Sequence, residues 1–146
     1  MRSAGLAVTV TEHQAAARSA AQAAQTLGCS VAEIAKSLVF RGDVSGEPLL
    51  VVASGEHRID LGKLKALLGE PVSKPDATYV REVTGFAIGG IPPLGHARPL
   101  RTLIDQNLLR FATVYAAGGT PNAMFPVAPA ELVRATGGLV ADVHEA

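Results

Sequence analysis

The stretch that decides the fold is SVAEIAKSLVFRGDVSGEPLLVVAS, residues 30–54. Its first residues predict a short helix, because Ser30 and Glu33 have the spacing of a capping box. The segments SLVFRG and PLLVVAS are rich in β-branched and apolar residues, so each predicts a strand. Between them, DVSGE has the composition of a hairpin turn. Residues 30–54 therefore predict a helix followed by an antiparallel pair of strands.

The rest of the chain predicts further helices and strands around this hairpin. Apolar residues at helical spacing, with capping residues or glycines at the ends, predict helices at residues 11–28, 60–69, 76–85 and 128–138. Short β-rich runs predict strands at residues 86–88, 99–105, 111–117, 123–127 and 139–143. In the first helix, Thr11 and Gln14 would form the capping box. We expect an α+β fold, a single domain over residues 1–146 with a curved, mixed, mostly antiparallel sheet and flanking helices.

Composition narrows the class of protein. The chain has 13 basic and 13 acidic residues, so a nucleic-acid partner would have to be held by a local patch and not by overall charge. Cys29 is the single cysteine, which excludes an intramolecular disulfide and is compatible with a reducing compartment. No signal peptide and no membrane span are predicted. We therefore expect a cytoplasmic protein that does not associate with a membrane.

A second stretch, FAIGGIPPLGHARPL at residues 86–100, has the composition of a binding loop. Glycines let a ligand approach the backbone closely, and prolines fix the backbone and remove a hydrogen-bond donor. A second glycine-containing loop, GGTPN, occupies residues 118–122. If the strands before these loops end at the same edge of the sheet, the loops converge on a pocket.

The side chains that could perform chemistry each have an ordinary alternative. Lys36 is either a lysine whose charge offsets a helix dipole or a cation that binds a phosphate or polarises a carbonyl. His96 is either a general base or a solvated loop histidine. Cys29 is either a nucleophile or a small buried hydrophobe. No nucleotide-binding motif, metal-ligand spacing or serine-nucleophile motif is present, so we expect no cofactor and no metal.

Four segments of the chain match one known family in order and in spacing. They are IAKSLVF, LVVASGEHRIDLGKLKALLG, TGFAIGGIPPLGHARPLRTLID and ATVYAAGGTPNAMFPVAPAELVRATGGLVADV. Together they resemble the YbaK / prolyl-tRNA synthetase-associated editing domain family, from about residue 24 to residue 143. Members of that family hydrolyse wrongly charged aminoacyl-tRNAs, either as freestanding domains or as domains inserted in a synthetase.

The resemblance implies a set of site residues. Lys36 matches the lysine that deacylation requires in the family, and Gly90 is carried over with it as catalytic. The implied substrate-binding residues come from β-rich segments and from both glycine loops: Ser37, Ser54, Gly89, Ile91, Pro92, Pro93, Gly95, His96, Gly118 and Gly119.

The implied activity is hydrolysis of the ester bond of mischarged tRNA for a small amino acid such as Ser, Thr, Ala or Cys. Aminoacyl esters are already labile, so positioned water and stabilisation of the oxyanion suffice without a covalent nucleophile. The implied partners are the aminoacylated acceptor end of tRNA and an aminoacyl-tRNA synthetase. The basic residues expected to contact phosphates, or else to form a solvated face, are Arg98, Arg101, Lys63, Lys65 and Lys74. The alternative is a non-catalytic module of the same fold that binds aminoacyl-tRNA or an amino acid.

Overall fold

A computed structural model describes residues 11–12, 20–56, 58–86, 91–93, 96, 100–118 and 123–145 of the chain. Eight strands in these residues form one sheet: β1 (Thr11–Glu12), β2 (Ile34–Gly42), β3 (Pro48–Ser54), β4 (Val72–Ser73), β5 (Arg101–Asp105), β6 (Val114–Ala117), β7 (Ala123–Val127) and β8 (Leu139–Ala141). The helices are α1 (Ala20–Leu27), α2 (Leu61–Leu68), α3 (Ala77–Thr84) and α4 (Pro129–Thr136), with 3₁₀ turns at η2 (Val31–Glu33) and η3 (Gln106–Arg110).

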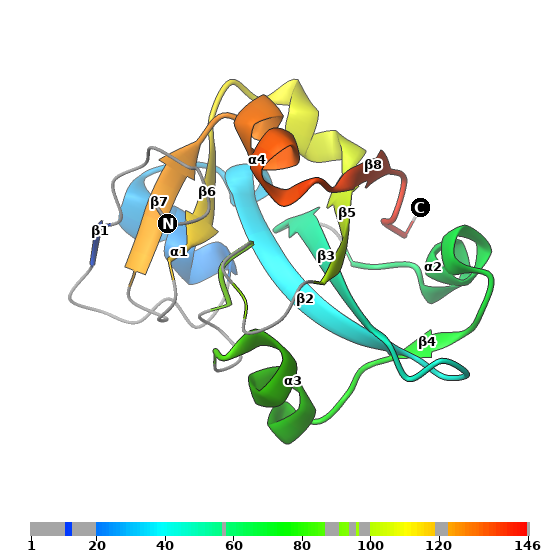
Figure 1. Ribbon diagram of the computed structural model, residues 1–146. Coiled ribbons are helices and arrows are strands. Elements are labelled where there is room, and N and C mark those ends of the chain that lie inside the picture. The colour runs from blue at the N-terminus through cyan, green and yellow to red at the C-terminus, as the bar shows by residue number, and fades with distance from the viewer. Residues whose placement is uncertain are drawn as a thin grey trace.

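The strands follow the order β1-β7-β6-β2-β3-β5-β8, with β4 paired to β2 off this path. Four strand pairs are antiparallel, and the pairs β2–β6, β3–β5 and β5–β8 are parallel. Figure 1 shows β2 as a long bent strand through the middle of the molecule, with β6 and β7 to its left and α2 and β4 to its right. The predicted α+β class, with a curved mixed sheet and flanking helices, is confirmed.

The hairpin of β2 and β3 is the centre of the fold, as its sequence predicts. The two strands pair from Ala35 opposite Ser54 to Arg41 opposite Pro48 without interruption. Every residue of β3 is buried. This burial explains why PLLVVAS is apolar throughout and does not alternate, since both of its faces are covered.

Successive residues of β2 and β3 point to opposite faces of the sheet, and each face has its own core. The core on one face, here called the loop-side core, includes Ala35, Val39, Leu50, Val52, Val80, Ile91, Ile104, Phe125 and Leu132. The core on the other face, here called the α2-side core, consists of Phe40, Leu49, Val51, Ala53, Leu64, Val72, Leu103 and Val143. A side chain on β2 can therefore be assigned to a face from its position in the strand.

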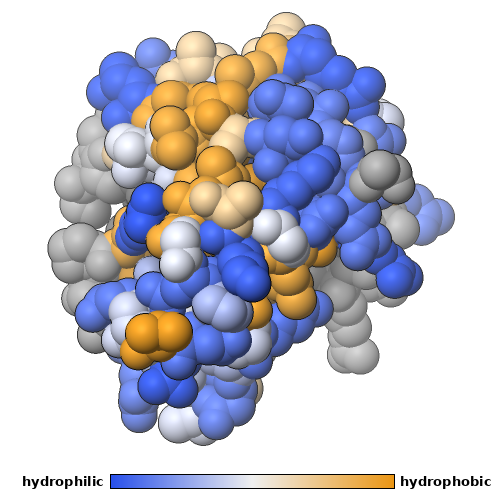
Figure 2. Space-filling model, turned by 90° about the vertical axis from the view of Figure 1, so that its right-hand side faces the viewer, coloured by the Kyte–Doolittle hydropathy of each residue, from blue (hydrophilic) through white to orange (hydrophobic). Residues whose placement is uncertain are grey.

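The face that carries α2 and β8 also exposes several apolar side chains. Figure 2 turns the right-hand side of Figure 1 to the viewer and shows an apolar area bordered by hydrophilic residues. The large apolar side chains exposed on these two elements are Leu61, Leu67 and Leu139.

Three helices have the boundaries that their sequences predict. Asp60 accepts hydrogen bonds from the backbone of Gly62 and Lys63 at the start of α2, and Asp76 accepts one from Tyr79 in α3. Gly69 and Gly85 end these helices with φ of 78° and 81°, a conformation that favours glycine. In α4, Pro129 occupies the first turn, where its missing N–H is not needed.

The start of the chain differs from the prediction. Thr11 does not cap a helix: it lies in β1, opposite Met124 of β7, and Gln14 falls outside the described residues. The strand predicted at residues 86–88 also lies mostly outside the described residues. The short strand β4 and the 3₁₀ turn η3 were not predicted, because two to five residues give too little periodicity.

Candidate functional site

Lys36 lies in a strand and not at the end of a helix. The capping box does form, since Glu33 Oε1 accepts hydrogen bonds from the Ser30 N–H at 3.0 Å and the Ser30 hydroxyl at 2.9 Å. The helix it opens is only the single 3₁₀ turn η2, and β2 begins at the next residue. Lys36 therefore has no helix dipole to offset, and that interpretation is wrong.

The register of the sheet places a carboxylate beside Lys36. Lys36 pairs with Ala53 of β3, and Val52 pairs with Ile104 of β5. Continuing that register by one residue sets Asp105 next to Ala53. Lys36, Ala53 and Asp105 thus form a row across three strands, on the face of the α2-side core.

Asp105 is fully buried and firmly held. Its Oδ2 accepts a hydrogen bond from the Ser54 N–H at 3.1 Å. Its Oδ1 accepts from the Asn107 N–H at 2.9 Å and from Asn107 Nδ2 at 3.0 Å. These three donors replace the hydrogen bonds to water that the buried carboxylate has lost. Asp105 was missed from the sequence, although the Asp-x-Asn pattern after an apolar strand is a signal for such a capped turn.

The pKa of the Lys36 ammonium is lowered from its ordinary value. Burial is the main cause, because it disfavours the charged form, and the nearby charge of Lys74 acts in the same direction. Asp105 opposes these effects and raises the pKa, while Arg58 lowers it. Lys36 is thus a half-buried cation. The buried Asp105 carboxylate favours its charged form, and the charges of Lys74 and Arg58 disfavour it.

Ser37 points to the opposite face from Lys36, because the β2–β3 pairing is regular. Its Oγ is buried and has no hydrogen-bond partner among the described residues. It shares its face with Ala35 and Val39, in the core that contains Ile91 of the first glycine loop. A buried hydroxyl without a partner is costly to the fold and is a ready contact for a polar ligand group.

Ser54 is fully buried at the end of β3. Its hydroxyl donates to the Ala32 carbonyl at 2.8 Å, and its N–H donates to Asp105. These bonds tie η2 and β5 to the strand that carries Ala53. Ser54 therefore positions Asp105, and its predicted contact with a substrate stays a prediction.

Part of the first glycine loop is described. Ile91, Pro92 and Pro93 are buried, and His96 is half-buried. His96 Nε2 lies 2.7 Å from the Pro92 carbonyl, so Nε2 carries the proton and Nδ1 is left as an acceptor. The ring also meets Phe86 edge-on, with centroids 6.4 Å apart. Burial lowers the pKa of His96 more than the bond to Pro92 raises it, so the neutral ring is favoured.

Of the glycines predicted in the site, only Gly118 is described. It is half-buried and directly follows β6. Gly89, Gly90, Gly95 and Gly119 lie outside the described residues, so the predicted convergence of the two loops stays a prediction.

The described residues give no support to a cysteine nucleophile, a metal site or a membrane-spanning helix. Burial, followed by the charge of Glu33, raises the pKa of the Cys29 thiol and disfavours a nucleophilic thiolate. No group of three or more His, Cys, Asp or Glu in the described ranges could hold a metal ion. None of the helices in those ranges is long and apolar enough to cross a membrane.

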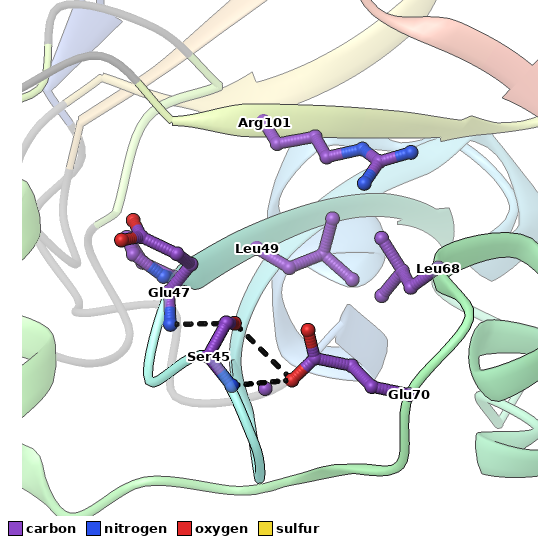
Figure 3. A pocket seen from close by; sticks show the side chains of 8 residues that line it. Ser45, Glu47, Leu49, Leu68, Glu70 and Arg101 are labelled. Carbon is purple, nitrogen blue, oxygen red and sulfur yellow. Dashed lines mark hydrogen bonds between the residues drawn. The ribbon is translucent and has the colours of Figure 1, made fainter.

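A separate hollow of about 310 Å³ opens between the β2–β3 turn and α2. Figure 3 shows Glu70 on its floor, accepting hydrogen bonds from the N–H and hydroxyl of Ser45, with Arg101 on the opposite wall. Arg101 is one of the predicted phosphate contacts, and the other lining residues do not belong to the predicted site. This hollow is therefore distinct from the region around Lys36.

Comparison with known proteins identifies the family. The sequence profile of the aminoacyl-tRNA editing domain matches residues 14–135, so the chain belongs to the aminoacyl-tRNA editing domain family. The resemblance found in the sequence is thereby confirmed.

Individual relatives agree with this assignment. A solved structure described as that of a proposed trans-editing enzyme for prolyl-tRNA synthetase is 46% identical, covers 99% of this chain and 92% of its own, and has a TM-score of 0.94. YwhH of Bacillus subtilis, an uncharacterised protein, is 38% identical over 84% of this chain and 78% of its own. EbsC of Enterococcus faecalis, whose name proposes a Cys-tRNA(Pro)/Cys-tRNA(Cys) deacylase, is 26% identical over 86% of this chain and 76% of its own.

Proposed function

We propose that this chain is a deacylase that hydrolyses the ester bond of mischarged aminoacyl-tRNA for a small amino acid such as Ser, Thr, Ala or Cys. The observation that carries the proposal is the half-buried Lys36 ammonium in one row with the buried Asp105. A cation in a partly desolvated position stabilises developing negative charge better than the same cation in water.

In the proposed reaction, water attacks the ester carbonyl carbon and negative charge develops on the carbonyl oxygen. The Lys36 ammonium either stabilises that charge directly or binds the terminal phosphate and so positions the ester for attack. The bond between the carbonyl carbon and the ribose oxygen then breaks. The ribose oxygen takes up the proton that the attacking water releases, giving the free amino acid and a tRNA with intact terminal hydroxyls. A neighbouring ribose hydroxyl of the substrate can assist in activating the water.

Lys36 serves this role as a charge and not as a base. Burial lowers the pKa of Lys36, and Asp105 opposes that effect by favouring the ammonium. Ile91 of the first glycine loop packs on the face of the sheet opposite Lys36. We propose that Pro92 and Pro93, which are buried, form a rigid wall that excludes larger side chains where this loop approaches the site. Because one methylene changes binding by only about 1–3 kcal/mol, such a wall rejects large amino acids better than near-isosteres.

The relatives suggest which tRNA to test. The names of the solved trans-editing structure and of EbsC refer to prolyl-tRNA synthetase and to tRNA(Pro). A proline–tRNA ligase of Desulfotalea psychrophila is 32% identical over 62% of this chain and 15% of its own length. We therefore propose tRNA(Pro) as the first substrate and prolyl-tRNA synthetase as a partner, in the cytoplasm.

The proposal is tested with tRNA(Pro) charged in turn with Ser, Thr, Ala, Cys and Pro, under single-turnover conditions. The proposal is supported if the protein hydrolyses one or two of the esters of small amino acids faster than they hydrolyse spontaneously. Pro-tRNA(Pro) should not be hydrolysed above its spontaneous rate. Binding of the charged tRNA without hydrolysis of any ester would overturn it in favour of a non-catalytic binding module.

A further inference from the structure

Several basic side chains of the described residues are already engaged by acidic groups. Lys63 Nζ donates to Asp142 Oδ1 and Oδ2 at 2.9 Å and to the His144 carbonyl at 2.8 Å. Arg110 is paired with Glu56. These ion pairs make such side chains poor ligands for an external phosphate, including Lys63, which the sequence offered as a phosphate contact.

Arg58 and Lys74 are different from these paired residues. Both are exposed, and neither makes an ion pair with another residue that the structure describes. Their charges act on the same group, the Lys36 ammonium. Lys36, Arg58 and Lys74 are therefore close enough to interact, and Asp105 supplies a negative charge that offsets part of their repulsion.

The fold explains why residues so far apart in sequence meet here. Arg58 precedes Ile59, which forms a β-bridge with His144 and packs on the α2-side core. Lys74 directly follows β4, whose Val72 packs on the same core. Lys36 points to this face of β2 as well. Arg58 and Lys74 thus belong to segments that pack on the face of the sheet to which Lys36 points.

We propose that Arg58 and Lys74 bind backbone phosphates of the tRNA acceptor end and so hold the terminal ester against Lys36. The inference rests on the proposed function, because it takes the ester to lie at Lys36. A chain with no formal net charge has no long-range attraction for RNA, so exposed cations such as Arg58 and Lys74 have to supply the affinity locally. Phosphates would also compensate the repulsion among the three cations.

The ligand class follows from this geometry. Lysine and arginine side chains that bind phosphates fix the position of a nucleic acid without reading its sequence. We therefore expect Arg58 and Lys74 to contribute equally to all aminoacyl-tRNAs, and the choice of amino acid to be made elsewhere in the site.

The test compares Arg58→Gln, Lys74→Gln and the double variant on two substrates. One is the charged tRNA that wild type hydrolyses best, and the other is the 3′-aminoacyl ester of adenosine, which has no phosphate. For the double variant we expect KM for the tRNA to rise at least tenfold with kcat unchanged. The salt dependence of kcat/KM should lose about one unit of slope per residue removed. Rates on the adenosine ester should stay at the wild-type value.

Arg81→Gln is the matched control, because Arg81 is exposed on α3, whose Val80 packs on the loop-side core. Arg58→Lys and Lys74→Arg keep the charge and should retain most of the affinity for tRNA. An unchanged KM and salt slope in the double variant, with wild type active, would overturn this inference alone. Equal losses on the tRNA and on the adenosine ester would also overturn it. Absence of hydrolysis by wild type would instead overturn the proposed function.

Discussion

Lys36 and Asp105 lie on the same face of the sheet, on strands β2 and β5, with Ala53 of β3 between them. They are 69 positions apart in sequence, and the β2–β3–β5 register alone brings them into one row. The carboxylate is buried and holds its place through bonds to Ser54 and Asn107. The proposed chemistry depends on this pair, and each partner predicts a measurable consequence.

Asp105→Asn should reduce both stability and the range of pH over which the protein is active. An amide offers one acceptor where the carboxylate offers two, so a donor of Ser54 or Asn107 would face another donor. We expect the free energy of unfolding to fall by about 1–3 kcal/mol in urea titrations. The exposed change Glu82→Gln on α3 is the control and should have little effect.

The pH profile separates a positioning role of Asp105 from a purely structural one. Removing the carboxylate takes away the interaction that raises the pKa of Lys36. If the ammonium is the active form, deacylation should decline at lower pH in Asp105→Asn than in wild type, after subtraction of spontaneous hydrolysis. A uniform loss of rate with an unshifted profile would contradict this account.

Lys36→Met should remove activity without lowering stability. Because burial lowers the pKa of Lys36, the unfolded chain, with a lysine pKa of about 10.4, binds the proton more tightly than the folded chain. Stability of the wild type therefore rises with pH between the folded pKa and about 10.4, and the cost of the ammonium is fully present below the folded pKa. We expect the variant to be at least as stable at pH 7 and to lack this rise in urea titrations, whereas Lys65→Met, at an exposed position of α2, should retain it.

His96 should make stability depend on pH in the acid range. Burial lowers its pKa below the ordinary value of about 6.5, so the unfolded chain takes up the proton first as the pH falls. The stabilising contribution is complete above about pH 6.5 and is lost as the pH falls through the folded pKa. His96→Gln, which keeps a donor for the Pro92 carbonyl, should flatten the curve of free energy of unfolding between pH 7 and pH 5. Identical curves for both proteins would contradict the buried placement of the ring.

Ser37→Ala tests whether the unpartnered hydroxyl faces the substrate. Its burial without a hydrogen bond costs the fold about 1–3 kcal/mol, so we expect the variant to be as stable as wild type or more so. If the hydroxyl contacts the amino-acid moiety, KM should rise for esters with a polar side chain and not for Ala-tRNA. Equal KM changes for all esters, or none, would exclude such a contact.

The hairpin of β2 and β3 and the three helices with clear caps could be predicted from the sequence, because each has its own local signals. The position of Lys36 could not, since the Ser30–Glu33 box predicts a longer helix than the sheet allows. Pairing with β3 and β6 takes up residues from Ile34 onward and limits the helix to one turn. Tertiary pairing here overrides a correct local signal.

The family and Lys36 could be found from motifs, but the surroundings of Lys36 could not. Asp105, Arg58 and Lys74 come from three separate segments that only the strand register and the packing of β4 and Ile59 bring to one face. A single acidic residue after an apolar strand gives no indication of which lysine it will meet. Long-range charge relationships of this kind need the three-dimensional structure.

The most direct test of the central claim is the single-turnover rate constant for ester loss from the best-hydrolysed charged tRNA, measured for wild type, Lys36→Ala and Arg81→Ala. Removing one group that stabilises an oxyanion typically lowers the rate about 100- to 1,000-fold. We predict a loss of that size for Lys36→Ala and a wild-type rate for Arg81→Ala. A rate for Lys36→Ala within a few fold of wild type, in a folded protein, would contradict the assignment of Lys36 as the catalytic cation.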